Sequence, residues 1–259
     1  MTKATTLNWN TTLAAVWRPN NQQLKAISHL DDIQVSSLLG IDRQKLLLIE
    51  NTERFINNKP CNNALLWGSR GTGKSSLVKA VFNQYKDQNL RIIEVFKQDL
   101  HFLHDIVDQI REQPFRFIIY CDDFAFNAND ASYQSLKTVL DGSLEAAPDN
   151  IRLYATSNRR HLVPQTMKEN LDFKVVNGNG ELHLSDAIEE KIALSDRFGL
   201  SLSFYPISQK QYLEIVDHYF IGQDIAPEVL HQEAVKFATQ KSSRSGRTAK
   251  QFFNFYSQH

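Results

Sequence analysis

The chain has 259 residues, of which 42% are hydrophobic, and its 29 basic residues equal its 29 acidic residues. This length and apolar content suffice for one large domain, or for a large and a small one, and they exclude an intrinsically disordered chain. The balanced charge excludes an overall field that attracts nucleic acid or an anionic membrane, so any such binding must come from a local patch.

The N-terminal sequence and the cysteines indicate the compartment. The opening MTKATTLNWNTTL has no apolar stretch after Lys3, and no later segment approaches the roughly 20 apolar residues that cross a bilayer. Cys61 and Cys121 are too few for a disulfide framework and lack metal-ligand spacing. We therefore expect a cytoplasmic protein that does not bind membranes and keeps both cysteines reduced.

The first two thirds of the chain predict an α/β domain. Residues 1–36 are polar apart from isolated apolar clusters such as LAAVW, and we expect an extension packed on the main domain. Strands are then predicted at Ala64–Trp67, Arg91–Val95, Phe115–Cys121, Ile151–Thr156 and Leu200–Tyr205. Most are continuous apolar runs separated by long helix-compatible stretches. This pattern indicates a parallel sheet covered by helices on both faces, over residues 37–205.

After Pro206 the sequence predicts helices only. They are SQKQYLEIVDHYF, PEVLHQEAVKFATQ and GRTAKQFFNFYSQ. Ser208 is the expected N-cap of the first helix, and Gly222 is the residue expected to close it. A small helical domain over residues 206–259 is therefore predicted to follow the sheet.

The first predicted strand leads directly into a phosphate-binding loop. After ALLW, the residues GSRGTGKS and the apolar helix opening SLVKAVF match G-x-x-x-x-G-K-[ST] in its strand–loop–helix context. The glycines allow backbone N–H groups to turn toward a phosphate at the start of the helix. A chance match in a glycine-rich turn would not require this strand and helix. We expect nucleotide contacts from Gly68, Ser69, Arg70, Gly71, Thr72, Gly73, Lys74, Ser75 and Ser76.

Polar residues after the next strands complete a site for ATP and Mg²⁺. Lys74 would bind the β- and γ-phosphates, and Ser75 would coordinate Mg²⁺. FIIYCDD carries a hydrophobic strand to Asp122, expected to hold the metal, and Asp123, expected to act as general base. Asn158 is the candidate sensor that orients the attacking water. Without the phosphate loop, solvated acids at a strand end would be the better interpretation.

These segments together resemble the AAA+ superfamily, and more closely a bacterial family of uncharacterised AAA+-like ATP-binding proteins classed as a domain of unknown function. The resemblance runs from Gly40 to the C-terminus. Its carriers are LLGIDRQK, NTERF, NNALLWGSRGTGKSSLVKA, FIIYCDD, IRLYATSNRRHL, EEKIALSDRFGLSLSFYP and SGRTAKQFF. It implies a P-loop NTPase (AAA+) fold, a three-layer α/β/α structure with a parallel sheet of order 5-1-4-3-2, followed by a helical lid.

The resemblance also implies roles for residues outside the loop. Adenine would lie near Gly40 and Ile41. Arg197, in SDRFGL, resembles the finger that reaches the γ-phosphate of a neighbouring subunit, which implies a homo-oligomer whose assembly can depend on nucleotide. Arg247, in SGRTAKQFF, resembles the second sensor of the lid, with Arg244 as an alternative. Each arginine also has an ordinary interpretation as a surface charge.

Two departures from the family pattern concern hydrolysis. AAA+ enzymes usually have Glu where this chain has Asp123, and the shorter side chain predicts slow hydrolysis. The related family tends to read DDLSFE where this chain reads DDFAFN, so Asn127 stands here in place of that glutamate.

The sequence predicts an ATPase that changes the conformation of a protein or nucleic-acid client. The basic cluster Arg159-Arg160-His161 could contact DNA or a protein partner, or pair with acids on its own surface. An ATP-operated switch or scaffold with negligible turnover is the alternative that Asp123 favours. A P-loop kinase acting on a small molecule would not explain Arg197 or a lid with Arg247.

Overall fold

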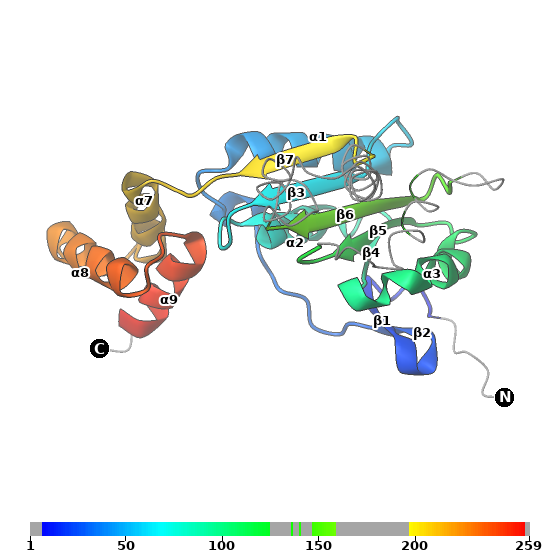
Figure 1. Cartoon of the computed structure of the whole chain (residues 1–259), viewed down its shortest axis with the longest axis horizontal. Helices are drawn as coiled ribbons and strands as arrows, with labels where there is room; N and C mark the ends of the chain where they lie inside the picture. The colour runs from blue at the N-terminus through cyan, green and yellow to red at the C-terminus, as the bar shows by residue number, and fades with distance from the viewer. Residues whose placement is uncertain (1–6, 125–135, 137–139, 141–146, 159–196, 257–259) are drawn as a thin grey trace, which may run out of the picture.

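A computed structural model describes residues 7–124, 136, 140, 147–158 and 197–256 (Figure 1). Its centre is a seven-stranded sheet of order β2-β1-β4-β5-β6-β3-β7. The strands are β1 (Ala14–Arg18), β2 (Gln23–Ala26), β3 (Ala64–Gly68), β4 (Leu90–Glu94), β5 (Arg116–Cys121), β6 (Ile151–Ser157) and β7 (Leu200–Phe204). Only the β1–β2 pair is antiparallel among these strand pairs.

All five predicted strands are confirmed, each ending within one residue of its predicted bounds. Numbered in chain order, they are β3, β4, β5, β6 and β7, and their arrangement β7-β3-β6-β5-β4 is the expected order 5-1-4-3-2. The fold is therefore the α/β P-loop NTPase fold of the AAA+ type.

Residues 7–36 do more than pack on the main domain, and here the sequence analysis missed two strands. Strand β1 pairs in parallel with β4, with Ala14 opposite Ile92, and β2 pairs with β1 at the edge of the sheet. Ahead of β1, Trp9 packs edge-to-face on Phe117 with ring centroids 4.9 Å apart. Strand β1 joins the sheet through a partner, β4, from a distant part of the chain, which local periodicity does not reveal.

Helices cover both faces of the sheet, as predicted. Helices α1 (Asp42–Ile56) and α2 (Lys74–Tyr85) bury Leu48, Phe55, Leu77 and Val81 against one face, which presents Leu66, Ile118 and Tyr120. Helix α3 (Leu103–Ile110) buries Ile106 and Ile110 against the other face, which presents Leu65, Ile119 and Leu153. Successive residues of a buried strand point into two different cores. Because both faces are buried, the sequence of the strand is continuously apolar. No helix in the described part of the chain is long and apolar enough to cross a membrane.

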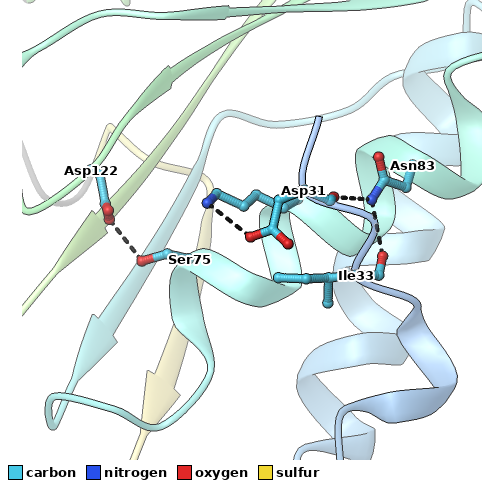
Figure 2. A network of polar contacts seen from close by, with 6 residues as sticks. Asp31, Ile33, Ser75, Asn83 and Asp122 are labelled. Atoms are coloured by element: carbon cyan, nitrogen blue, oxygen red, sulfur yellow. Dashed lines mark hydrogen bonds and ion pairs between the residues drawn. The ribbon is translucent and has the colours of Figure 1, made fainter. Parts of the chain in front are cut away.

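The segment between β2 and α1 runs along the outside of α2. Asn83 Nδ2 donates to the carbonyl oxygens of Asp31 at 2.8 Å and Ile33 at 3.0 Å (Figure 2). Lys79 pairs with the Asp31 carboxylate at 3.4 Å. These contacts tie the segment that leads to Gly40 to the helix that begins at the phosphate loop.

Three C-terminal helices form a cluster with its own core. They are α7 (Gln209–Tyr219), α8 (Pro227–Gln240) and α9 (Gly246–Tyr256), and Figure 1 shows them beyond the arrowheads of β3, β6 and β7. Buried side chains from all three helices meet, among them Tyr212, Leu230 and Phe252. Ser208 is confirmed as the N-cap of α7, in a capping box with Gln211. Helix α7 ends at Tyr219 with Phe220 as its C-cap, so Gly222 lies in the following turn and is not the capping residue.

Candidate nucleotide-binding site

The phosphate loop lies between β3 and α2, as predicted. Helix α2 begins at Lys74, and its N-cap Gly73 has a left-handed backbone with φ of 94°. Only glycine adopts this conformation without a steric cost. Thr72 Oγ1 donates to the carbonyl oxygen of Ser69 at 2.7 Å and so closes the loop on itself. The free N–H groups of the first turn of α2 then face the position at which a phosphate binds such loops.

Lys74 is only 7% exposed and lies under the loop. Its Nζ donates to the carbonyl oxygens of Gly68 at 2.7 Å and Ser69 at 2.6 Å, and to Asn158 Oδ1 at 3.3 Å. Burial lowers the pKa of Lys74, whereas the nearby carboxylates of Asp122 and Asp123 act in the opposite direction. The lysine is therefore a desolvated cation held between the loop and the acidic strand end.

Ser75 and Asp122 form the candidate magnesium site. Asp122 follows β5 directly, and Ser75 Oγ donates to Asp122 Oδ1 at 2.8 Å (Figure 2). Burial would raise the pKa of Asp122, but the hydrogen bonds from Thr156 and Ser75 act against it, and the pKa lies below the ordinary value. Asp122 thus stays ionised, and a hydroxyl with a carboxylate is the hard-oxygen donor set that suits Mg²⁺. The residues present fit the metal that the sequence predicts.

Asp123 and Asn158 are also brought together. Asn158 Nδ2 donates to Asp123 Oδ1 at 2.5 Å, while Asn158 Oδ1 accepts from Lys74. The backbone of Asp123 is left-handed, with φ of 52°, which turns its side chain from the strand direction toward β6. One amide therefore connects the candidate general base with Lys74, the lysine expected to bind phosphate.

Thr156 is a residue of this site that the sequence analysis did not identify. Its side chain is 2% exposed, and Oγ1 donates to Asp122 Oδ1 and accepts from the Asp123 N–H at 3.1 Å. Its carbonyl oxygen accepts from the Phe124 N–H. Thr156 holds both acids through one hydroxyl. Its position at the end of a buried strand, two residues before the candidate sensor, was the available signal.

The other wall of the site comes from Gly40, Ile41 and helix α7. Ile41 is 6% exposed, and its Cδ1 would lie 3.5 Å from a Cβ atom added to Gly73. Gln211 Nε2 would lie 3.6 Å from a Cβ atom added to Gly40. The residues expected near adenine therefore lie between the phosphate loop and the helical cluster.

Helix α9 contacts the phosphate loop at its N-terminus. A Cβ atom on Gly71, where φ is 75°, would lie 2.8 Å from Ser245 Oγ and 3.7 Å from Arg247 Cβ, so only glycine allows this close approach. The charge of Arg247 is close enough to lower the pKa of Lys74, after burial as the larger cause. Of the two candidate sensor arginines, Arg247 is the one beside the loop; Arg244 lies at the exposed turn before α9.

Arg197 is not brought to this site. It precedes β7, whose residues Leu200 and Phe204 lie opposite Ala64 and Gly68 of β3. The phosphate loop follows Gly68, so the strand alone separates the two by about 13 Å at roughly 3.3 Å per residue. Arg197 therefore lies toward the opposite end of the sheet from its own phosphate loop.

Two parts of the sequence analysis lie outside the described residues. They are the cluster Arg159-Arg160-His161 and the departure over residues 125–127.

The model of the family described as "Protein of unknown function (DUF815)" matches residues 10–259. No curated protein matches the chain. Among solved structures, a point mutant of Thermotoga maritima RuvB is 12% identical with a TM-score of 0.48, over 86% of this chain and 72% of that one. The Thermotoga maritima RuvB Holliday junction branch migration motor is 13% identical with a TM-score of 0.45, over the same shares.

Proposed function

Since the chain belongs to the family described as Protein of unknown function (DUF815) and has an AAA+-type P-loop fold, we propose that it binds ATP with Mg²⁺ and hydrolyses it slowly. The free energy of ATP binding and hydrolysis would be used to change the conformation of a protein or nucleic-acid client. The observation that carries this proposal is that two hydrogen-bonded groups of side chains lie together at the carboxyl ends of three adjacent strands. They are Lys74, Asn158 and Asp123 in one group, and Ser75 and Asp122 in the other.

Nucleotide binding follows from the donors of the loop and from the charge of Lys74. The N–H groups at the start of α2 and the lysine ammonium would receive the β- and γ-phosphates. The longest bond of Nζ, 3.3 Å to Asn158, is the one that a phosphate oxygen would replace most easily. Ser75 and Asp122 would hold Mg²⁺. When bound, the ion neutralises negative charge on the phosphate oxygens.

Hydrolysis needs a base and an oriented water. Asp123 would accept the proton of the attacking water, and Asn158 would hold the Asp123 carboxylate by its Nδ2 donor. Because the Asn158 amide also bonds to Lys74, its position would depend both on the γ-phosphate bound by Lys74 and on Asp123. This supports Asn158 as the sensor.

The proposal extends to the lid and to assembly. Residues 206–259 would be the lid on the 37–205 domain, with residues 1–36 as an extension of its sheet. Arg247, beside Gly71, would sense the nucleotide from the lid. Arg197 would act on the nucleotide of a neighbouring subunit, because its own lies beyond the length of β7. We accordingly propose a cytoplasmic homo-oligomer whose assembly can depend on ATP or ADP.

One observation favours a second function, an ATP-operated switch with negligible turnover. Asp123 is one methylene shorter than glutamate, and its Oδ1 is hydrogen-bonded to Asn158. A carboxylate held in this way reaches less far toward an attacking water. ATP binding without hydrolysis would then be enough to change the conformation of the protein.

Phosphate release across protein concentration separates the two functions. We expect turnover that requires Mg²⁺ and rises more than linearly with protein concentration, with Lys74→Ala inactive under the same conditions. Parallel assays with and without DNA test the class of client. Tight Mg-ATP binding without phosphate release would support the switch. Failure to bind ATP at all would refute both.

A further inference from the structure

The hydroxyl of Tyr120 is buried beside the candidate magnesium site. Tyr120 is 3% exposed and belongs to the last part of β5, two residues before Asp122 on the same face of the strand. Its oxygen is buried and makes no hydrogen bond of normal geometry within the described part of the chain. Asp122 and Ser75 both lie near this hydroxyl.

Packing explains the ring of Tyr120 but not its hydroxyl. The ring lies among apolar side chains such as Leu77, Val78 and Ile118, where phenylalanine would fill the same space. A buried hydroxyl without a partner carries a desolvation cost that phenylalanine avoids, so an unpaired one in a native core needs an explanation. Tyr154 shows the ordinary solution. It lies opposite Tyr120 on β6, and its hydroxyl bonds to Thr52 at 2.8 Å and Asn51 at 3.1 Å.

The arrangement of donors on Asp122 indicates what the Tyr120 hydroxyl is for. Ser75 and Thr156 both donate to the same carboxylate oxygen, Oδ1. A metal bound by Ser75 and Asp122 needs these two groups at a fixed separation, because Mg²⁺ tolerates little deviation from octahedral geometry. A further hydroxyl donor to an ionised carboxylate forms a strong, charge-assisted hydrogen bond that can fix its rotation.

We propose that Tyr120 is a positioning residue for the magnesium site: its hydroxyl donates to the Asp122 carboxylate when Ser75 and Asp122 hold the Mg²⁺ of bound nucleotide. The inference rests on the proposed function and adds to it a residue that controls metal affinity. Partners of this kind, which orient a ligand without touching the metal, typically change metal affinity by about 10- to 100-fold.

The test compares Tyr120→Phe with Tyr154→Phe and with the parent protein. ATP binding is measured by calorimetry over a series of Mg²⁺ concentrations and in EDTA, and thermal unfolding is followed without nucleotide. For Tyr120→Phe we expect the Mg²⁺ midpoint to rise about 10- to 100-fold. Its ATP affinity in EDTA should equal that of the parent, and its melting temperature should be unchanged or higher. Tyr154→Phe should keep the parental Mg²⁺ midpoint and melt at a lower temperature, because it leaves Thr52 and Asn51 without their partner.

Three outcomes would overturn the inference. A parental Mg²⁺ midpoint in Tyr120→Phe would show that the hydroxyl does not act on the metal site. If Tyr120→Phe loses as much ATP affinity in EDTA as it loses with Mg²⁺, the substitution distorts the loop and does not act through the metal site. Tyr120→Leu is the second variant with which to repeat the measurement. If the parent binds no ATP even with saturating Mg²⁺, the proposed function fails and the inference fails with it.

Discussion

Replacing Thr156 by valine tests whether its hydroxyl, on strand β6, holds Asp122 and Asp123 in place. Valine keeps the branched shape and removes the hydroxyl that donates to Asp122 and accepts from the Asp123 N–H. A hydrogen bond to a charged group contributes about 1.5–3 kcal/mol, and one between neutral groups about 0.5–1.5 kcal/mol. Because both acids are exposed to water that can replace part of these bonds, the lower ends apply. We expect Thr156→Val to lower the free energy of unfolding by about 2 kcal/mol.

The same substitution should change the acid dependence of stability. Burial favours a higher pKa for Asp122, but the hydrogen bonds from Thr156 and its neighbours bring it below the ordinary value of 3.8. Because the folded pKa is the lower one, ionised Asp122 contributes stability that is present above the unfolded pKa and is lost as the pH falls through the folded pKa. Without the Thr156 hydroxyl the folded pKa rises toward 3.8, so less stability remains to be lost below about pH 4.

Urea unfolding of the parent, Thr156→Val and the control Thr156→Ser measures both effects. Near-neutral pH reports the full difference, and a series below about pH 4 reports the acid dependence. Serine keeps the hydroxyl and should retain most of the stability. Equal unfolding free energies for parent and Thr156→Val, with the same acid dependence, would refute the reasoning. A loss in Thr156→Ser as large as in the valine variant would do the same.

Three further predictions concern the nucleotide. Lys74→Ala should abolish tight ATP binding and keep the fold, measured by calorimetry and circular dichroism; equal ATP affinity in variant and parent would contradict the role of the lysine. Asp123→Asn should bind Mg-ATP normally and release phosphate at least tenfold more slowly, a barrier increase of about 1.4 kcal/mol, and unchanged turnover would remove Asp123 as the base. Arg197→Ala should bind ATP normally and hydrolyse it poorly, because a finger supplied by a neighbour is worth about 10³–10⁵ in turnover. Adding Lys74→Ala subunits, which keep Arg197, should restore turnover in mixed oligomers; no recovery although mixed oligomers form would refute a finger acting between subunits.

The strands that build the site could be predicted from the sequence because their signals are local. Five predicted strands, among them Ala64–Trp67 and Ile151–Thr156, are confirmed within one residue, since all except the edge strand β7 are largely buried on both faces. The loop from Gly68 to Ser75 can also be predicted from the sequence, because its glycines and its lysine lie close together in the chain. Ser208 is likewise confirmed as an N-cap, through a bond to a residue three positions away.

Other features depend on contacts between distant parts of the chain, and only the tertiary structure decides them. Strand β1 becomes a strand by pairing with β4, and its few apolar residues do not show this in advance. Thr156 is an ordinary strand residue until the alignment of β5 and β6 brings its hydroxyl to Asp122. Similarly, the approach of Gly71 to Ser245 exists only because the C-terminal helices fold back on the phosphate loop. Sequence determines local backbone and burial through short-range periodicity, whereas the direction and partner of each polar side chain depend on strand register and helix packing, which no short segment contains.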